Sequence, residues 1–197
     1  PPAPAPDVVA DVPNQARENR PHDDDLEDQH DAIATGARRT TTLVEFVDSY
    51  RQITRLAPPE KKRIRLAEMF EAVLRLARAE CPRDDVEFSA EVHPSELDVY
   101  ADRVLLEPVL INLLRNAWQA TESTDKPVIR LSGRLNRRHN VVIEVADNGP
   151  GIPADIATKI FVPFFTTREK GSGVGLALAR QVMIAHGGFI RVNSGDD

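Results

Sequence analysis

The sequence predicts an α/β fold in which a mixed sheet and a layer of helices form a two-layer sandwich, preceded by one long helix. After residue 60, segments that alternate apolar and polar residues are interleaved with segments of helical periodicity. The strand-like segments come in hairpin-like pairs, which favours a mixed sheet with helices on one face. Before residue 58 the apolar residues follow a seven-residue repeat, which is typical of a helix that packs on a partner.

The composition excludes several classes of protein. The 197 residues, 41% hydrophobic and 28% charged, suit one globular domain with an additional element. A net charge of −6 argues against a nucleic-acid or membrane contact, since both need a basic footprint. The single cysteine, Cys81, excludes an internal disulfide and fits a reducing compartment. Because no apolar run is long enough to cross a bilayer and no secretion signal opens the chain, we expect a cytoplasmic location, in a soluble protein or in the cytoplasmic part of a membrane-bound one.

Two segments precede the α/β domain. Residues 1–27 are rich in Pro and Asp, so we expect a loop or a disordered lead-in. Residues 28–59 are predicted to form a long helix that Pro58 and Pro59 end. Its second half carries a heptad seam with spacings of 3, 4, 3 and 4, formed by Leu43, Phe46, Tyr50, Ile53 and Ala57. This stripe needs a partner helix, although a helix that lies on its own domain shows the same pattern.

Residues 62–197 are predicted to form the α/β domain. Alternation and β-branched residues predict strands at 63–66, 86–92, 97–100, 128–135, 141–146 and 189–193. Helical periodicity predicts helices at 67–79, 101–121 and 175–186, and the last of these should end at a left-handed Gly187. In the first helix the residues expected to face the core are Phe70, Val73, Leu74 and Ala77. In the second helix they are Leu106, Leu110, Leu113, Ala117 and Ala120.

The first motif with functional chemistry is the pair Asn112 and Asn116. Residues four apart stack on a helix, and both project from the edge of the apolar stripe, where a helix lines a cleft. Asn is a mediocre helix former, and an amide oxygen is a suitable ligand for Mg²⁺. The alternative is that both side chains simply hydrogen-bond to nearby backbone.

The second motif, Asp147-Asn148-Gly149-Pro150-Gly151-Ile152, directly follows a predicted strand. A carboxylate at a strand end is able to accept a hydrogen bond from the exocyclic amine of adenine. Gly149 and Gly151 permit positive φ and a close approach of the backbone to a flat ring. The alternative is a simple turn, because these residue types are the usual ones in turns.

The third motif places three of the seven phenylalanines within Phe161-Val162-Pro163-Phe164-Phe165. They are candidates to hinge and anchor a mobile lid, or to form a satellite hydrophobic cluster under a long loop.

The fourth motif, Gly171-Ser172-Gly173-Val174-Gly175-Leu176, opens the last long helix. Glycines at a helix N-terminus expose N–H groups and the positive dipole end to phosphate, and Arg168 and Lys170 lie just before it. A flexible loop with a helix cap is the alternative. The motif is neither a dinucleotide fingerprint, since no strand runs into it, nor a Walker loop, since no Gly-Lys-Ser/Thr follows.

The four motifs in this order, within about 70 residues, resemble the N, G1, F and G2 boxes of the histidine kinase catalytic domain. This domain belongs to the family shared with gyrase, Hsp90 and MutL ATPases, and the resemblance covers about 63–194. It implies the Bergerat ATP-binding fold, and the details are closest to nitrogen-regulation-type sensor kinases. Residues 28–59 resemble the second helix of a dimerisation hairpin, which implies a homodimer in the intact protein.

The resemblance implies a role for each motif. Asn116 should coordinate Mg²⁺, and Asn112 should contact phosphate or its hydration. Asp147 should bind adenine in a pocket shaped by Gly149, Gly151 and Ile152. Gly173 and Gly175 should cradle phosphate under the lid, and Arg168 and Lys170 should reach the γ-phosphate. The other residues expected to bind ATP are Phe161, Gly171, Val174 and Leu176.

The residue at 112 separates the branches of this family. The ATPases carry a glutamate four residues before the Mg-binding Asn, whereas Asn112 is no general base. The site therefore resembles one that holds ATP for an external nucleophile, namely a histidine that passes the phosphoryl group to a response-regulator receiver domain. Two alternatives remain open: a nucleotide-binding regulatory module or degenerate kinase without phosphotransfer, and an ATPase of the wider family.

A phosphoacceptor histidine is predicted to be missing from this chain. His22 lies in the Pro/Asp-rich lead-in, and His30 lacks the usual Thr or Asn four residues later, where Ala34 stands. The other histidines, His93, His139 and His186, fall in predicted loops or at a helix end. We also expect the domain to be truncated at its C-terminus.

Overall fold

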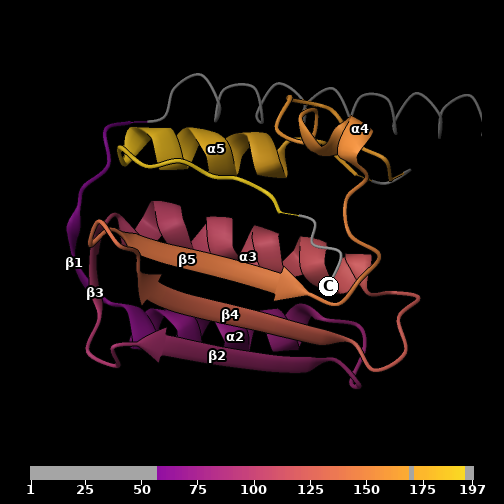
Figure 1. The fold of residues 1–197 in the computed structure, drawn as a ribbon, viewed down its shortest axis with the longest axis horizontal. Coiled ribbons are helices and arrows are strands. Elements are labelled where there is room, and N and C mark those ends of the chain that lie inside the picture. The colour runs from indigo at the N-terminus through magenta and orange to yellow at the C-terminus, as the bar shows by residue number, and fades with distance from the viewer. Residues whose placement is uncertain (1–56, 169–170, 194–197) are drawn as a thin grey trace, which may run out of the picture. The chain divides into compact units, whose positions relative to one another are not determined.

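The computed structural model describes residues 57–168 and 171–193 (Figure 1). The lead-in 1–27, the predicted helix up to residue 56 and Lys170 lie outside the described residues, and residues 57–59 form no helix. The elements are β1 (Lys62–Arg65), α2 (Leu66–Glu80), β2 (Glu87–His93), β3 (Asp98–Ala101), α3 (Arg103–Ala120), β4 (Val128–Leu135), β5 (Val141–Asp147), α4 (Ala154–Ala157) and α5 (Gly175–Ala185).

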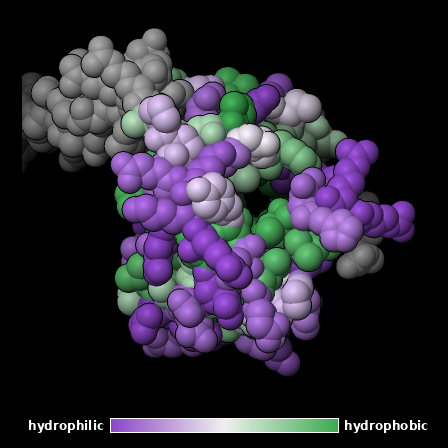
Figure 2. All heavy atoms as spheres, turned by 90° about the vertical axis from the view of Figure 1, so that its left-hand side faces the viewer, coloured by the Kyte–Doolittle hydropathy of each residue, from purple (hydrophilic) through white to green (hydrophobic). Residues whose placement is uncertain are grey.

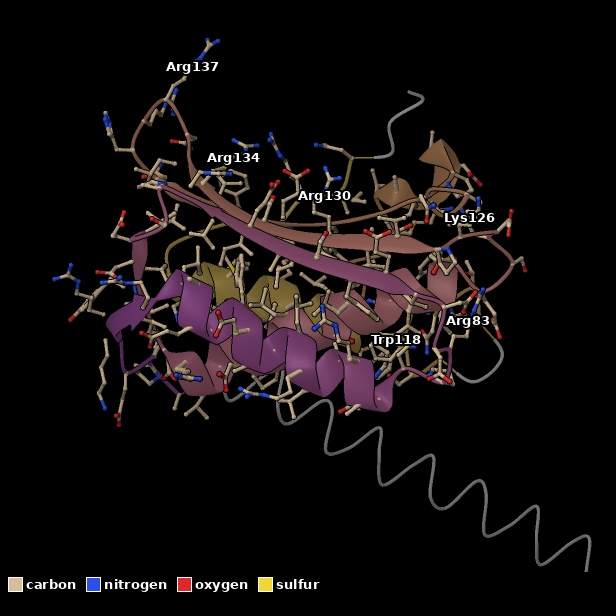
Figure 3. The ribbon with its side chains drawn as sticks, turned by 90° about the horizontal axis from the view of Figure 1, so that it is seen from below. Arg83, Trp118, Lys126, Arg130, Arg134 and Arg137 are labelled. Carbon is tan, nitrogen blue, oxygen red and sulfur yellow. The ribbon has the colours of Figure 1, made fainter. Side chains whose placement is uncertain are left out.

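The strands form two small sheets, and the predicted two-layer α/β architecture is confirmed. In the larger sheet, β4 lies between β2, which runs parallel to it, and β5, which runs antiparallel. β1 and β3 form a separate antiparallel pair. α2 and α3 cover one face of the larger sheet, while Arg130 and Arg134 of β4 project from the other (Figures 1 and 3).

The core lies between the larger sheet and the two long helices. All four residues expected to face inward from α2 are buried: Phe70, Val73, Leu74 and Ala77. In α3 three of the five expected residues lie in this core, whereas Leu114 is buried there instead of Leu113 and Ala120 is only half-buried. Trp118 packs edge-on against Phe88 of β2 and closes the core at the end of α3.

Helix α3 has a second apolar face, which explains the error. Val109 of α3 packs on Ala179 and Val182 of α5, and Leu113 lies at the edge of this cluster. A helix covered on two sides carries a wider apolar stripe than one that covers a sheet alone. α3 therefore lies between the sheet and α5.

Two further expectations for the C-terminal part were wrong. Residues 189–193 form no strand, because they pair with no other strand in the described part of the chain, although Ile190 packs on the α3–α5 cluster. Between the second and third motifs, where no helix was predicted, the chain forms the short helix α4. The end of α5 is confirmed, since Gly187 has a φ of +79° and donates to Ile184 O at 2.9 Å.

The face that carries β1 and β3 is mainly hydrophilic, with hydrophobic residues exposed around a hollow near its middle (Figure 2). A cross-strand ion pair joins Arg65 Nε to Asp98 Oδ1 at 2.7 Å, and Arg63 also contacts this carboxylate. These two guanidinium groups lower the pKa of Asp98. No helix in the described residues is long and apolar enough to span a membrane.

A hydrogen-bonded junction ties the first described residues to the ends of α3 and α5. The Asp102 carboxylate accepts from Glu60 N at 2.8 Å and caps α3 by accepting from Val104 N at 2.9 Å. The Asp102 amide donates to His186 Nε2 at 3.0 Å, and Lys61 Nζ donates to His186 O at 2.9 Å. Segments up to 125 residues apart in sequence thus meet at one point.

We expect Asp102→Ala to lower the thermal unfolding midpoint and to weaken its dependence on acid. The hydrogen bond from the Glu60 amide is the largest cause that lowers the pKa of Asp102, followed by those from the first turn of α3. A carboxyl with a lowered folded pKa stabilises the fold above its unfolded pKa of about 4, and this stabilisation is lost as pH falls through the folded value. Thermal melts between about pH 7 and pH 3 measure both effects. An equal acid sensitivity of the variant and the parent would contradict this role.

Candidate functional site

Helix α3 is the frame of the candidate site. Contacts with three other segments occur at Asn112, Asn116 and Ala120, which lie at successive turns of this helix. Eight residues of α-helix span about 12 Å, and residues four apart lie on the same side. Three of the four sequence motifs are therefore aligned along one side of α3.

The Asn112 side chain lies against the backbone of Gly175, the first residue of α5. A Cβ on Gly175 would stand 2.8 Å from the Cγ of Asn112, so only glycine permits this approach. The Nδ2 amide of Asn112 is buried and has no hydrogen-bond partner among the described residues. A buried donor without a partner is costly, and a phosphate oxygen or a hydration water next to α5 would satisfy it.

The N-terminus of α5 is open to an anion. No side chain of the described residues caps it, and the residue before it, Val174, is buried. The first N–H groups of a helix have no acceptor within the helix and carry its positive dipole end. Together with Asn112, this helix start presents free donors, and their binding to phosphate stays a prediction.

The loop before α5 is held by its own backbone. Gly173 has a φ of +65°, and its carbonyl accepts from Phe164 N at 2.8 Å. A Cβ on Gly173 would stand 2.7 Å from both the Cα and the carbonyl oxygen of Phe164. The phenylalanine motif and the glycine motif therefore contact each other directly, and Phe161, in the same loop, is half-buried.

The Arg168 side chain contacts the C-terminal half of α3. Its guanidinium donates to the carbonyl of Asn116 at 3.3 Å and to Oε1 of Gln119. The Thr166 hydroxyl accepts from Arg168 N at 3.1 Å and shapes the turn at the start of this loop. Arg168 thus lies near Asn116, and these hydrogen bonds are to the protein itself, so its expected contact with phosphate stays a prediction.

The turn after β5 brings Gly149 to the last turn of α3. Asp147 Oδ1 accepts from Gly149 N at 3.0 Å, which holds the carboxylate over the turn. A Cβ on Gly149 would stand 2.8 Å from Asp147 Oδ1 and 2.9 Å from the carbonyl oxygen of Ala120. A side chain at position 149 would collide with Ala120 and Asp147, so glycine is required there. Glycine is favoured at position 151 because the φ there is +75°. The half-buried Ile152 follows.

A cavity of about 430 Å³ lies beside this turn. Its walls are Gln119, Ala120, Glu122, Ser123, Thr124, Asn148, Gly149 and Pro150. It adjoins the predicted adenine end of the site through Gly149, but Asn116, Asp147 and Gly173 do not line it. The site is therefore assembled by contacts along α3 rather than around one enclosed cavity.

Sequence reasoning missed three residues of this region. Gln119 accepts from Arg168, Thr166 holds the turn before it, and Asn148 binds the backbone at the start of β4. Asn148 was quoted only as a turn residue, and the one available signal was its place between Asp147 and Gly149. Gln119 gave no signal, because its contact with Arg168 spans 49 residues and depends on the path of the loop. Thr166 makes a local contact two residues along the chain, which a Thr before a turn suggests only weakly.

The residues present fit a magnesium ion that is bound together with phosphate. The described residues contain no cluster of three or more His, Cys, Asp or Glu that would hold a metal alone. Mg²⁺ usually keeps several waters and takes one or two protein oxygens plus phosphate oxygens. The half-buried Asn116, one turn from Asn112, is positioned to supply one such oxygen.

Comparison with known proteins identifies relatives of this arrangement. Residues 101–197 match the family described as histidine kinase-, DNA gyrase B-, and HSP90-like ATPase. The nitrogen regulation protein NtrY of Azorhizobium caulinodans is 33% identical over 161 residues, 79% of this chain and 20% of that protein. The sensory histidine kinase/phosphatase NtrB of Rhodobacter capsulatus is 34% identical over 182 residues, 83% of this chain and 48% of that protein. The chain thus spans less than half the length of these relatives.

Solved structures agree. The catalytic domain of histidine kinase ThkA matches with a TM-score of 0.56 and 33% identity, over 63% of this chain and 80% of that domain. ThkA in complex with the response regulator TrrA matches with a TM-score of 0.60 and 27% identity, over 88% of this chain and 48% of that one. The family model covers all four motifs. The chain therefore belongs to the histidine kinase catalytic domain family and carries its ATP-binding α/β fold.

Proposed function

We propose that this chain binds Mg-ATP and donates the γ-phosphate to a histidine, as the catalytic part of a two-component signalling kinase. The observation that supports this most directly is the packing of Asn112 against Gly175 at the start of α5. Among the described residues, the buried amide of Asn112 has no hydrogen-bond partner and no side chain caps this helix start. The relatives named as sensory histidine kinases support the same reaction.

Each motif has a distinct task in this proposal. Asp147 accepts a hydrogen bond from the adenine amine, since its second oxygen is not used by Gly149. The start of α5 binds phosphate through backbone N–H groups, and Arg168 and Lys170 supply positive charge. Magnesium, held with the help of Asn116, supplies charge neutralisation of the phosphates when bound.

The absence of a carboxylate at position 112 favours transfer over hydrolysis. Phosphoryl transfer depends mainly on alignment and charge neutralisation, whereas hydrolysis also requires an oriented water. The amide of Asn112 does not accept a proton at neutral pH, so it does not activate water as a base. The expected acceptor is therefore a histidine side chain carried on another helix.

The partners follow from the same proposal. A response-regulator receiver domain receives the phosphoryl group, and a related kinase has been seen in complex with a response regulator. A homodimer through the helix predicted at 28–59 and a cytoplasmic location stay predictions.

Two measurements test the proposed function. A ligand that binds only the folded state raises stability, so Mg-ADP at about a hundred times its dissociation constant should add about 2.7 kcal/mol to the free energy of unfolding. Labelled phosphate should then pass from ATP to a histidine-bearing hairpin supplied in trans. Nucleotide binding without transfer would favour a regulatory module, and steady phosphate release without the hairpin would favour an ATPase. An unchanged melting midpoint with Mg-ADP would reject the nucleotide site itself.

We expect Asn116→Ala to remove the Mg²⁺ dependence of nucleotide binding, because the helix then offers no amide oxygen at this turn. Titration calorimetry with ADP, with and without Mg²⁺ in chelator-treated buffer, measures this effect. Asn140→Ala, in the hairpin between β4 and β5, is the matched control and should keep the dependence. Persistence of the Mg²⁺ effect in the Asn116 variant would assign the metal to another ligand.

A further inference from the structure

Asn148 joins the end of β5 to the start of β4 by three hydrogen bonds. Its Oδ1 accepts from Val128 N at 2.8 Å, and its Nδ2 donates to Lys126 O at 3.0 Å. Its own amide donates to Val128 O at 3.3 Å. Val128 is the first residue of β4, 20 residues away along the chain, and Lys126, labelled in Figure 3, is 22 residues away in the loop before β4. The side chain therefore hydrogen-bonds to the backbone through both its carbonyl oxygen and its amide nitrogen.

The residues on either side of Asn148 belong to the adenine end of the proposed site. Asp147 is the last residue of β5 and pairs with Ile129, and Gly149 donates to the Asp147 carboxylate at 3.0 Å. Within the described residues β5 is an edge strand that pairs with β4 alone. The end of an edge strand has few backbone hydrogen bonds to hold it, so it opens at low free-energy cost. Asn148 adds bonds at this end.

We propose that Asn148 is a positioning residue that fixes the Asp147 carboxylate and thereby sets the preference of the site for adenine over guanine. This rests on the proposed function. Adenine carries an amine at the position where guanine carries a carbonyl oxygen, so a fixed carboxylate accepts from adenine and repels guanine. A carboxylate on a fraying strand end moves away from both bases, and the two affinities converge. Hydrogen bonds weaken steeply as their geometry departs from linearity, so a displaced carboxylate discriminates less between the two bases.

The same hairpin offers a matched control. Asn136, at the opposite end of the β4–β5 pair, accepts from Arg138 N at 2.9 Å and from Asn140 N at 3.0 Å. Its side chain accepts two hydrogen bonds from the backbone of a turn, and the side chain of Asn148 likewise makes two hydrogen bonds to backbone groups. Asn136 lies beyond the other end of β5 from Asp147, 11 residues away along the chain. Asn136→Ala therefore reports the loss of two such bonds without a change at Asp147.

The experiment compares Asn148→Ala, Asn148→Asp and Asn136→Ala with the parent chain. Titration calorimetry with Mg-ADP and Mg-GDP, at a temperature where each variant is folded, gives the ratio of the two dissociation constants. Asn148→Ala is expected to weaken ADP binding about tenfold and to reduce the GDP-to-ADP ratio at least fivefold. Asn148→Asp keeps the acceptor for Val128 N, so its GDP-to-ADP ratio should fall between that of the parent and that of Asn148→Ala. Asn136→Ala should lower the melting midpoint and keep the ratio.

The outcomes are separable. If Asn148→Ala lowers the melting midpoint but leaves the ratio within twofold of the parent, Asn148 is structural only and the proposal is overturned. If Asn148→Ala does not fold, an unchanged ratio in Asn148→Asp overturns it equally. Failure of the proposed function looks different, because the parent chain would then bind neither nucleotide.

Discussion

Replacing Asp147 by Asn is expected to weaken the binding of Mg-ADP at least tenfold. Asn keeps the size of the side chain, and its oxygen still accepts from Gly149 N, so the turn is retained. What is lost is the negative charge on the acceptor that faces the adenine amine. Charge-assisted hydrogen bonds contribute about 1.5–3 kcal/mol and neutral ones about 0.5–1.5 kcal/mol. A difference of about 1.4 kcal/mol is one factor of ten in affinity.

Calorimetric titration of both chains with Mg-ADP measures this effect. Asp84→Asn, in the loop between α2 and β2, changes the net charge equally and should leave the affinity unchanged. Equal affinities of the Asp147 variant and the parent would exclude this carboxylate as the adenine acceptor.

The second large effect is expected for Gly173→Ala, which should abolish measurable nucleotide binding. The backbone at Gly173 has a φ of +65°, which costs an alanine about 1–2 kcal/mol. The new Cβ would also stand 2.7 Å from the Cα of Phe164, and backbone atoms move aside only with the whole loop. The loop that ends at the phosphate-binding helix start is therefore displaced.

Gly187→Ala separates the effect of the positive φ from the effect of the Cβ contact. Gly187 has a φ of +79°, but a Cβ there would meet nothing within 4 Å. This control should lose about 1–2 kcal/mol of stability and keep its affinity for Mg-ADP. Thermal melts and titrations of both variants give the comparison. Retained binding in Gly173→Ala would show that contact with Phe164 does not position the phosphate loop.

The sequence predicted most of the fold because its elements have regular periods. The strand at 128–135 was predicted with its exact bounds, since Ile129 and Leu131 alternate with exposed residues. The buried face of α2 was also predicted, because this helix has a single apolar stripe that packs on a single sheet. α3 was harder, since its contacts with α5 place apolar residues on a second side and hide which of Leu113 and Leu114 faces the sheet.

The candidate site was predictable as residue types but not as contacts. The approach of Asn112 to Gly175 connects positions that are distant in sequence, and no local pattern contains it. The Arg168 contacts with α3 depend on the path of the loop, and the same holds for the missing strand at 189–193, which has no described neighbour to pair with. Local chemistry indicates candidates, whereas tertiary packing decides which of them meet.

Helix α5 begins at Gly175, beside Asn112, and its last turn hydrogen-bonds to Asp102 through His186. An α-helix of 11 residues is a stiff rod about 16 Å long. Any shift of its first turn that accommodates a phosphate group therefore also moves His186 relative to the residues at which the chain enters the domain. Nucleotide binding at the start of α5 would therefore be coupled through this one helix to the hydrogen bonds that Glu60 and Lys61 make with Asp102 and His186.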